Sequence, residues 1–340
     1  MACPTGDMMC RITRKTALIL AVIAAGFGAA ADGAAIRRAE PRKLWANPVD
    51  LESRNLFYGP GGRKHHPRTT EFVFVKEDDK GTNPKFIVTD ADGVKWKIKL
   101  GAEAQPETAA SRFVWAAGYY AHELYLLPAI HVANMPAKLH RGGKLVHPDG
   151  SMQNVRLLRN IDGEKKAGNW KWGESPFNTT REFNGLRVLM ALLNNWDLKD
   201  INNAIYETAD GKRIYMVTDL GATFGTTGIS WSKREWKGNL DAYRRSRFIR
   251  SMNADFVNFA VPARPQINGA VAPSNFVERF EMQWIGRRIP RQDARWMGRL
   301  LARLSHQQIR DAFRAAGYSA DEVEGFAQIV ESRIAELKVL

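Results

Sequence analysis

The chain has 340 residues, 44% of them hydrophobic, and a formal net charge of +14, which allows one large domain or two lobes with ample apolar side chains for a core. The positive charge is compatible with nucleic acid, anionic lipid or an acidic substrate as partner. The sequence has no nucleic-acid-binding motif, no interleaved aromatic platform and no block of like charges. We therefore expect no nucleic-acid partner.

The first residues have the order of a secretory signal peptide. Basic residues precede an apolar run at 17–31, which is shorter than the roughly 20 residues needed to span a bilayer. The run ends in small residues, so we predict removal of residues 1–31, export to the periplasm or the extracellular space, and no stable transmembrane span afterwards. The alternative is an uncleaved segment that anchors the chain in a membrane. Cys3 and Cys10 both lie in this leader, so the mature chain has no disulfide.

Residues 32–70 are predicted to form an irregular N-terminal extension. Its segment 58–66 is rich in turns and basic residues. Backbone N–H groups in such a segment could hold an anion, but a loop punctuated by Pro-Gly is the interpretation we favour.

Strands are expected from Glu71 onward. Three segments rich in β-branched and aromatic residues, at 72–75, 85–88 and 94–100, are separated by turn residues. Alternation in the third strand puts Val94, Trp96, Ile98 and Leu100 on one face, so the other face carries Lys95, Lys97 and Lys99.

A helix is predicted over 105–118, because proline lies in its first turn and Gly118 at its end. Glu107 lies in the first turn, where a carboxylate complements the helix dipole. Leu157 and Leu158 are predicted to lie in a buried strand. The glycine-rich segment 161–178 that follows is predicted to be a connector. Thr179 and Glu182 form a predicted capping box at the start of the next helix.

That helix leads into a stretch with two polar motifs. Asp197 and Asn202 lie five positions apart, and Asp219 follows after a strand, an Asp-Gly turn and a second strand. A hairpin of this kind would bring the three oxygen-bearing side chains together. Such oxygens suit Mg²⁺, which shares its coordination with substrate phosphates. Beyond Gly221, a run of arginines at 244–247 could hold an acidic acceptor or form a solvated helix face. Further along the chain, capping boxes at Ser305 and Ser319 predict two helices in the tail.

The motifs Asp197-Leu-Lys-x-x-Asn202 and Asp219-Leu-Gly resemble the catalytic and metal-binding loops of the protein-kinase-like superfamily. Lys97-Ile-Lys99 resembles the lysine strand of that superfamily. Glu107 resembles its helix glutamate, in a Glu-x-Ala-Ala run similar to the HipA-like branch. Asn195-Trp196 replaces the usual His-Arg, Leu220 replaces Phe, and the segment 76–84 is a poor glycine-rich loop. Departures of this kind occur in the HipA-like, phosphoinositide and secretory-pathway kinases.

The resemblance implies an α+β, two-lobed protein-kinase-like fold. Its antiparallel small lobe would span residues 71–160, the inter-lobe connector 161–178 and the mostly helical large lobe 179–340.

The resemblance also implies roles for single residues. Asp197 would orient the acceptor hydroxyl, Lys99 positioned by Glu107 would hold the nucleotide phosphates, and Asn202 with Asp219 would hold the metal.

The function implied by the resemblance is Mg²⁺-dependent (or Mn²⁺-dependent) transfer of a phosphoryl group from ATP to a hydroxyl. The acceptor is a protein, a lipid or a small molecule, acidic ones included. Three alternatives stay open: transfer of the nucleotidyl group, a secreted pseudokinase that acts as a binding or scaffold module without turnover, and a structural envelope protein whose Asp and Asn residues form turns.

Overall fold

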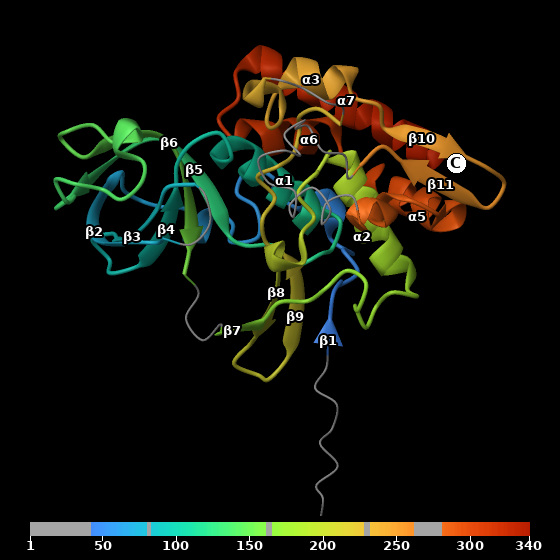
Figure 1. Ribbon diagram of the computed structural model, residues 1–340, viewed down its shortest axis with the longest axis horizontal. Coiled ribbons are helices and arrows are strands. Elements are labelled where there is room, and N and C mark those ends of the chain that lie inside the picture. The colour runs from blue at the N-terminus through green and yellow to red at the C-terminus, as the bar shows by residue number, and fades with distance from the viewer. Residues whose placement is uncertain (1–41, 80–82, 161–164, 228–231, 262–280) are drawn as a thin grey trace, which may run out of the picture. The chain divides into compact units, whose positions relative to one another are not determined.

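A computed structural model of the chain describes residues 42–79, 83–160, 165–227, 232–261 and 281–340, which all belong to one compact unit, Glu40–Leu340. The predicted signal peptide, part of the predicted extension and part of the acidic segment 76–84 lie outside the described residues. Helices and sheets are both present, as the α+β class requires (Figure 1). The division into two lobes and the domain boundaries stay predictions.

Five strands close into a barrel in the order β2-β3-β4-β6-β5. They are β2 (Glu71–Glu77), β3 (Lys85–Thr89), β4 (Lys95–Lys99), β5 (Leu124–Ala133) and β6 (Ser151–Arg159). Four of the pairings are antiparallel, whereas β2 and β5 pair in parallel. The sequence predicted an antiparallel arrangement throughout. A closed ring of five strands cannot alternate direction at every step, so one parallel pairing is unavoidable.

The alternation predicted for β4 is confirmed. Trp96 and Ile98 are buried in the barrel core, together with residues of the neighbouring strands such as Phe86 and Leu157. The opposite face carries the three lysines, and they differ in burial: Lys95 is exposed, Lys97 is half-buried, and Lys99 keeps only 4% of its surface accessible. Of these three lysines, Lys99 is therefore the one that is buried.

The predicted hairpin is confirmed by the antiparallel pair β8 (Asn203–Glu207) and β9 (Arg213–Val217). Gly211, with φ +74°, supplies the left-handed position that its turn requires. Two further strands extend this sheet: β7 (Lys165–Gly168) pairs with β8, and β1 (Arg42–Lys43) pairs in parallel with β9. β7 lies within the predicted connector and β1 within the predicted irregular extension.

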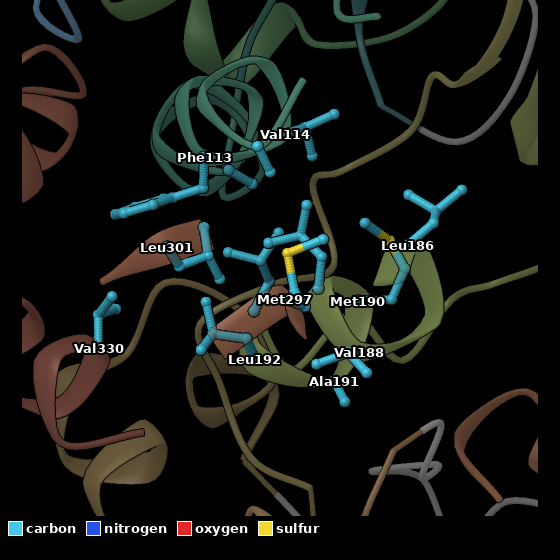
Figure 2. Close-up of a cluster of buried hydrophobic side chains, with 14 of the residues drawn as sticks. Phe113, Val114, Leu186, Val188, Met190, Ala191, Leu192, Met297, Leu301 and Val330 are labelled. Atoms are coloured by element: carbon cyan, nitrogen blue, oxygen red, sulfur yellow. The ribbon is translucent and has the colours of Figure 1, made fainter. Parts of the chain in front are cut away.

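A second and larger hydrophobic core lies among the helices (Figures 1 and 2). The helices are α1 (Ala104–Ala116), α2 (Arg181–Leu192), α3 (Leu240–Arg245), α5 (Arg291–Leu301), α6 (His306–Arg314) and α7 (Ala320–Lys338). Figure 2 shows Phe113 of α1, Leu192 of α2, Met297 of α5 and Val330 of α7 in this core. The core thereby joins α1 to the helices that follow the hairpin.

Short elements complete the described chain. The strands β10 (Ile249–Met252), β11 (Phe256–Phe259) and β12 (Ile289–Pro290) form a three-stranded sheet. The 3₁₀ turns are η1 (Leu51–Ser53), η2 (Arg63–His65), η3 (Gly143–Leu145), η4 (Asp200–Asn202), η5 (Lys233–Glu235) and η6 (Met282–Gly286). Within the described ranges, no helix combines the length and the apolarity needed to cross a bilayer.

The helix starts test the predicted capping boxes. Those at Ser305 and Ser319 are confirmed, with reciprocal bonds to Gln308 and Glu322. The box predicted at Thr179 is wrong by one position, because the cap of α2 is Thr180, whose hydroxyl accepts from the Phe183 N–H at 3.1 Å. Two adjacent threonines offer equivalent chemistry, so packing of the helix decides between them.

Candidate active site

The ammonium of Lys99 lies at the centre of a buried ion cluster. Its Nζ is 2.7 Å from Oε2 of Glu107, 2.9 Å from Oε2 of Glu103 and 3.6 Å from Oδ1 of Asp219. Arg156 of β6 adds a second cation, with Nη2 at 3.4 Å from Glu107. The pairing of Lys99 with Glu107, which the sequence implied only by order, is therefore present as a direct contact.

The local structure explains why these side chains meet. Lys99 ends β4, and α1 begins five residues later. Glu103 is the N-cap residue of α1 and Glu107 lies in its first turn. Side chains four residues apart lie on the same helix face, so both carboxylates face the strand lysine.

The charges of the cluster stabilise one another. Burial opposes the charged form of Lys99, but Glu107, Asp219 and Glu103 outweigh it and raise its pKa. Burial likewise disfavours ionised Glu107, yet Arg156 and Lys99 lower its pKa. The pKa of Asp219 is raised, because burial and the two glutamates outweigh the attraction of Lys99. Of the three acids, Asp219 is therefore the one that gains most from a further cation.

Asp197 and Asn202 are linked to this cluster through the hairpin. The side-chain amide of Asn202 donates to the backbone oxygen of Asp197 at 2.8 Å. The backbone oxygen of Asn202 accepts from the N–H of Thr218 at 2.9 Å and from that of Asp219 at 3.4 Å. Asp197, Asn202 and Asp219 are thus held by adjoining backbone, and Asp219 reaches Lys99.

Asp200 has a different environment. Its Oδ1 accepts from the backbone N–H of Trp172 at 3.0 Å, which ties the loop to the segment after β7. This contact gives Asp200 a structural role that its position in the motif did not indicate.

The donor set fits a hard divalent cation. One oxygen each from Glu103, Glu107 and Asp219 lies within 4.8 Å of the others, and oxygen ligands are those that Mg²⁺ and Mn²⁺ prefer. Glu103 and Glu107 are already committed to Lys99. The nitrogen of the Asn202 amide faces a carbonyl, so its oxygen is the atom available for a cation. Asp219 and Asn202 are therefore the residues that would hold the metal.

Sequence reasoning missed three members of this site. Glu103 could have been found, because it lies four residues from both Lys99 and Glu107. Arg156 gave no signal beyond its place in a strand. Lys237 pairs with Glu103 and lies 5.7 Å from the Trp196 ring, whose indole N–H donates to the Trp236 carbonyl at 2.8 Å. Lys237 thus connects α1 to the residue before Asp197.

A cavity of about 440 Å³ lies along β4 beside the cluster. It is lined by the apolar side chains Val75, Ile87 and Leu158, by Tyr206 and His122, and by the cations Lys76, Lys95, Lys97 and Arg159. Lys97 shares the outer face of β4 with Lys99, so the cavity and the cluster adjoin. An apolar wall with cations at its edge suits a flat ring system that carries phosphates.

The arginine run at 244–247 is engaged locally. Arg244 contacts Asp241 at 3.0 Å, Arg245 contacts Glu235 at 2.9 Å, and Arg247 donates to the backbone oxygens of Ile249 and Arg250. This occupation favours a structural role for the run over the binding of an acidic acceptor.

Comparison with solved structures finds atypical kinases. The proinflammatory kinase CtkA of Helicobacter pylori has 12% identity and a TM-score of 0.46, with 80% of this chain and 97% of that chain covered. A Golgi casein kinase has 11% identity and a TM-score of 0.36, over 86% of this chain and 76% of its own. A Golgi casein kinase structure with Mn and ADP bound has 11% identity and a TM-score of 0.35. The match covers 79% of this chain and 73% of that chain.

These neighbours are kinases, the class that the sequence motifs resemble. No protein-family model matches the chain, and no curated protein is significantly similar to it. Because the TM-scores lie below 0.5, we base the proposed function on the geometry of the site.

Proposed function

We propose that the protein transfers the terminal phosphoryl group of a nucleoside triphosphate, ATP in the simplest case, to a hydroxyl of an acceptor. The acceptor oxygen forms a bond to the γ-phosphorus, the bond from that phosphorus to the β,γ-bridging oxygen breaks, and the hydroxyl proton passes to the carboxylate of Asp197. The products are a phosphate ester and the nucleoside diphosphate. The observation that carries this proposal is the buried contact of Lys99 with Glu107 beside Asp219.

Each residue of the site has a task in this proposal. Lys99 holds phosphate oxygens, and its two glutamates keep it charged and aimed. Asp197 orients the acceptor hydroxyl. Asp219 and Asn202 would hold Mg²⁺ or Mn²⁺, which supplies positive charge to the phosphate oxygens when bound.

The cavity beside β4 gives the nucleotide a place. Its apolar wall would cover the base, and its cations would lie near the phosphates. The poor glycine-rich segment 76–84 leaves these side-chain cations to supply contacts that backbone N–H groups make elsewhere.

Nucleotide binding is the test of this proposal. A ligand present at a hundred times its dissociation constant stabilises the folded state by about 2.7 kcal/mol. We expect ATP with Mg²⁺ or Mn²⁺ to raise the melting temperature, and Lys99→Ala to lose the rise relative to its own ligand-free value. Lys138→Ala, which removes an exposed lysine that does not line the cavity, is the control.

The reaction products then distinguish phosphoryl transfer from the alternative functions. Release of nucleoside diphosphate with a labelled acceptor supports phosphoryl transfer, whereas release of pyrophosphate indicates nucleotidyl transfer. Binding without turnover for any acceptor, or for water, leaves the pseudokinase reading. If neither metal with millimolar ATP shifts the melting temperature, the proposed function is wrong and a structural role takes its place.

A further inference from the structure

We infer that a second pocket, formed by Trp172, Glu174, Asp200, Glu281, Met282 and Trp284, binds a positively charged side chain of a peptide acceptor. The inference rests on the proposed function and names the acceptor class. The pocket has a volume of about 270 Å³. It adjoins the catalytic loop, because Asp200 is three residues after Asp197.

The charge of the pocket is opposite to that of the chain as a whole. Three carboxylates line it, from Glu174, Asp200 and Glu281, in a chain of net charge +14. Its one lining cation, Lys171, is paired with Glu174 at 2.8 Å. The carboxylates of Asp200 and Glu281 have no ion pair with any described residue. Two unneutralised acids therefore face a small cavity in an otherwise basic protein.

An aromatic wall complements these acids. The Trp284 side chain is 40% exposed although it is large and apolar. The buried Arg187 holds it from behind, with its guanidinium carbon 5.3 Å from the ring centroid and its Nη2 donating to the Trp284 carbonyl at 2.9 Å. A fixed, partly exposed indole beside carboxylates is the arrangement that binds a guanidinium or an ammonium group.

A second tryptophan lines the pocket. Trp172 is 1% exposed, and its indole Nε1 has no acceptor among the described residues. Ile201, 73% exposed on the same loop, adds an apolar contact for an adjacent residue.

Chain length sets the position of the charge in the acceptor. The Cα atoms of Asp197 and Asp200 are at most about 11 Å apart, since each residue spans at most about 3.6 Å. An extended peptide covers that distance in about three residues. We therefore expect lysine or arginine within about three residues of the accepting serine or threonine.

The experiment compares three peptides that differ only beside one serine: arginine, glutamine or glutamate at the flanking positions. Full-length protein with magnesium and ATP should give a kcat/KM for the arginine peptide about tenfold above that for glutamine, and the glutamate peptide should be the poorest. Glu281→Gln and Trp284→Ala should each reduce the ratio of arginine to glutamine. Asp92→Asn, which removes an exposed acid of a barrel turn, should keep it.

A readout without turnover distinguishes failure of this inference from failure of the proposed function. The indole N–H resonances of Trp172 and Trp284, assigned with Trp172→Phe and Trp284→Phe, should shift when the arginine peptide is added. If they shift and no peptide is phosphorylated, the pocket stands and the transfer of phosphate to a peptide hydroxyl falls. Equal turnover of all three peptides, or indole shifts that do not depend on the peptide charge, would overturn the inference.

Discussion

Lys99, Glu103 and Glu107 show how much a single buried charge depends on its partners. Glu107 is 3% exposed and contacts both Lys99 and Arg156, whereas Glu103 shares Lys99 with it and also contacts Lys237. Loss of one partner from a buried pair costs roughly 3–5 kcal/mol, because the other charge is left uncompensated.

The two glutamates should therefore respond differently to neutralisation. We expect Glu107→Gln to lower stability by about 3 kcal/mol and to abolish nucleotide binding, because two cations lose their main partner. Glu103→Gln should weaken binding less, because Glu107 still holds Lys99. Urea unfolding and a nucleotide titration of both variants measure this. Equal losses in the two variants would contradict the order assigned to them.

Substitution of the two aspartates, Asp197 and Asp219, should also have different effects on nucleotide binding and turnover. Asp197→Asn should bind metal and nucleotide normally but turn over roughly 10²–10⁴-fold more slowly, the range typical of groups that handle a proton. Asp219→Asn should fail at both, because the phosphates lose metal charge. Isothermal titration with Mg²⁺ and ATP, beside an assay of product formation, separates the two effects. Loss of nucleotide affinity in Asp197→Asn would show that its assigned role is wrong.

At the scale of elements, the packing of α1 against the Asp219 loop depends on a glycine. A Cβ atom on Gly221 would lie 2.7 Å from Cβ of Glu103, closer than side-chain atoms normally approach. The close contact brings the start of α1 to the loop that carries Asp219. Overpacking of this kind typically costs 1–3 kcal/mol, so about 2 kcal/mol is a fair expectation.

Gly221→Ala should accordingly displace Glu103, lower the melting temperature and weaken nucleotide binding. Gly143→Ala is the matched control, because a Cβ atom there meets nothing within 4 Å. Thermal unfolding with and without Mg²⁺ and ATP measures both effects. A Gly221→Ala protein that behaves like Gly143→Ala would show that the contact can relax without consequence.

At the scale of the whole molecule, His122 makes stability depend on pH. Its ring is hydrogen-bonded to the Tyr206 hydroxyl at 3.0 Å, and burial, followed by the charge of Arg156, lowers its pKa from 6.5 to about 4. Below pH 6.5 the unfolded chain takes up a proton that the folded chain does not, so stability falls as the pH drops from about 6.5 to about 4. The loss is at most about 3 kcal/mol, and less in proportion to the water that reaches the half-buried ring.

His122→Gln, which keeps a polar partner for Tyr206, should remove this part of the pH dependence. Urea unfolding of both proteins at intervals between pH 7.5 and 4.5 measures the difference. The wild-type free energy of unfolding should fall more steeply than that of the variant. Parallel curves would assign the acid sensitivity to other groups.

The sequence by itself determined the local features of this protein. Alternation along β4 separated Trp96 and Ile98 from the lysine face, since strand periodicity is a property of the backbone. The Asp-Gly turn predicted the hairpin of β8 and β9, and the serine caps predicted α6 and α7, for the same local reason. The order of Lys99, Glu107, Asp197, Asn202 and Asp219 identified residues that the structure links through contacts.

Only the tertiary structure decided which partners complete the site. Arg156 and Lys237 reach Glu107 and Glu103 from segments 49 and 134 residues away, and no local periodicity encodes such a distance. The parallel closure of β2 on β5 follows from the number of strands in the ring, which no single strand reveals. The acidic pocket beside Asp200 needs side chains from three separate segments. Long-range packing brings these side chains together, because the burial of apolar surface stabilises the fold as a whole and is not a property of any one segment.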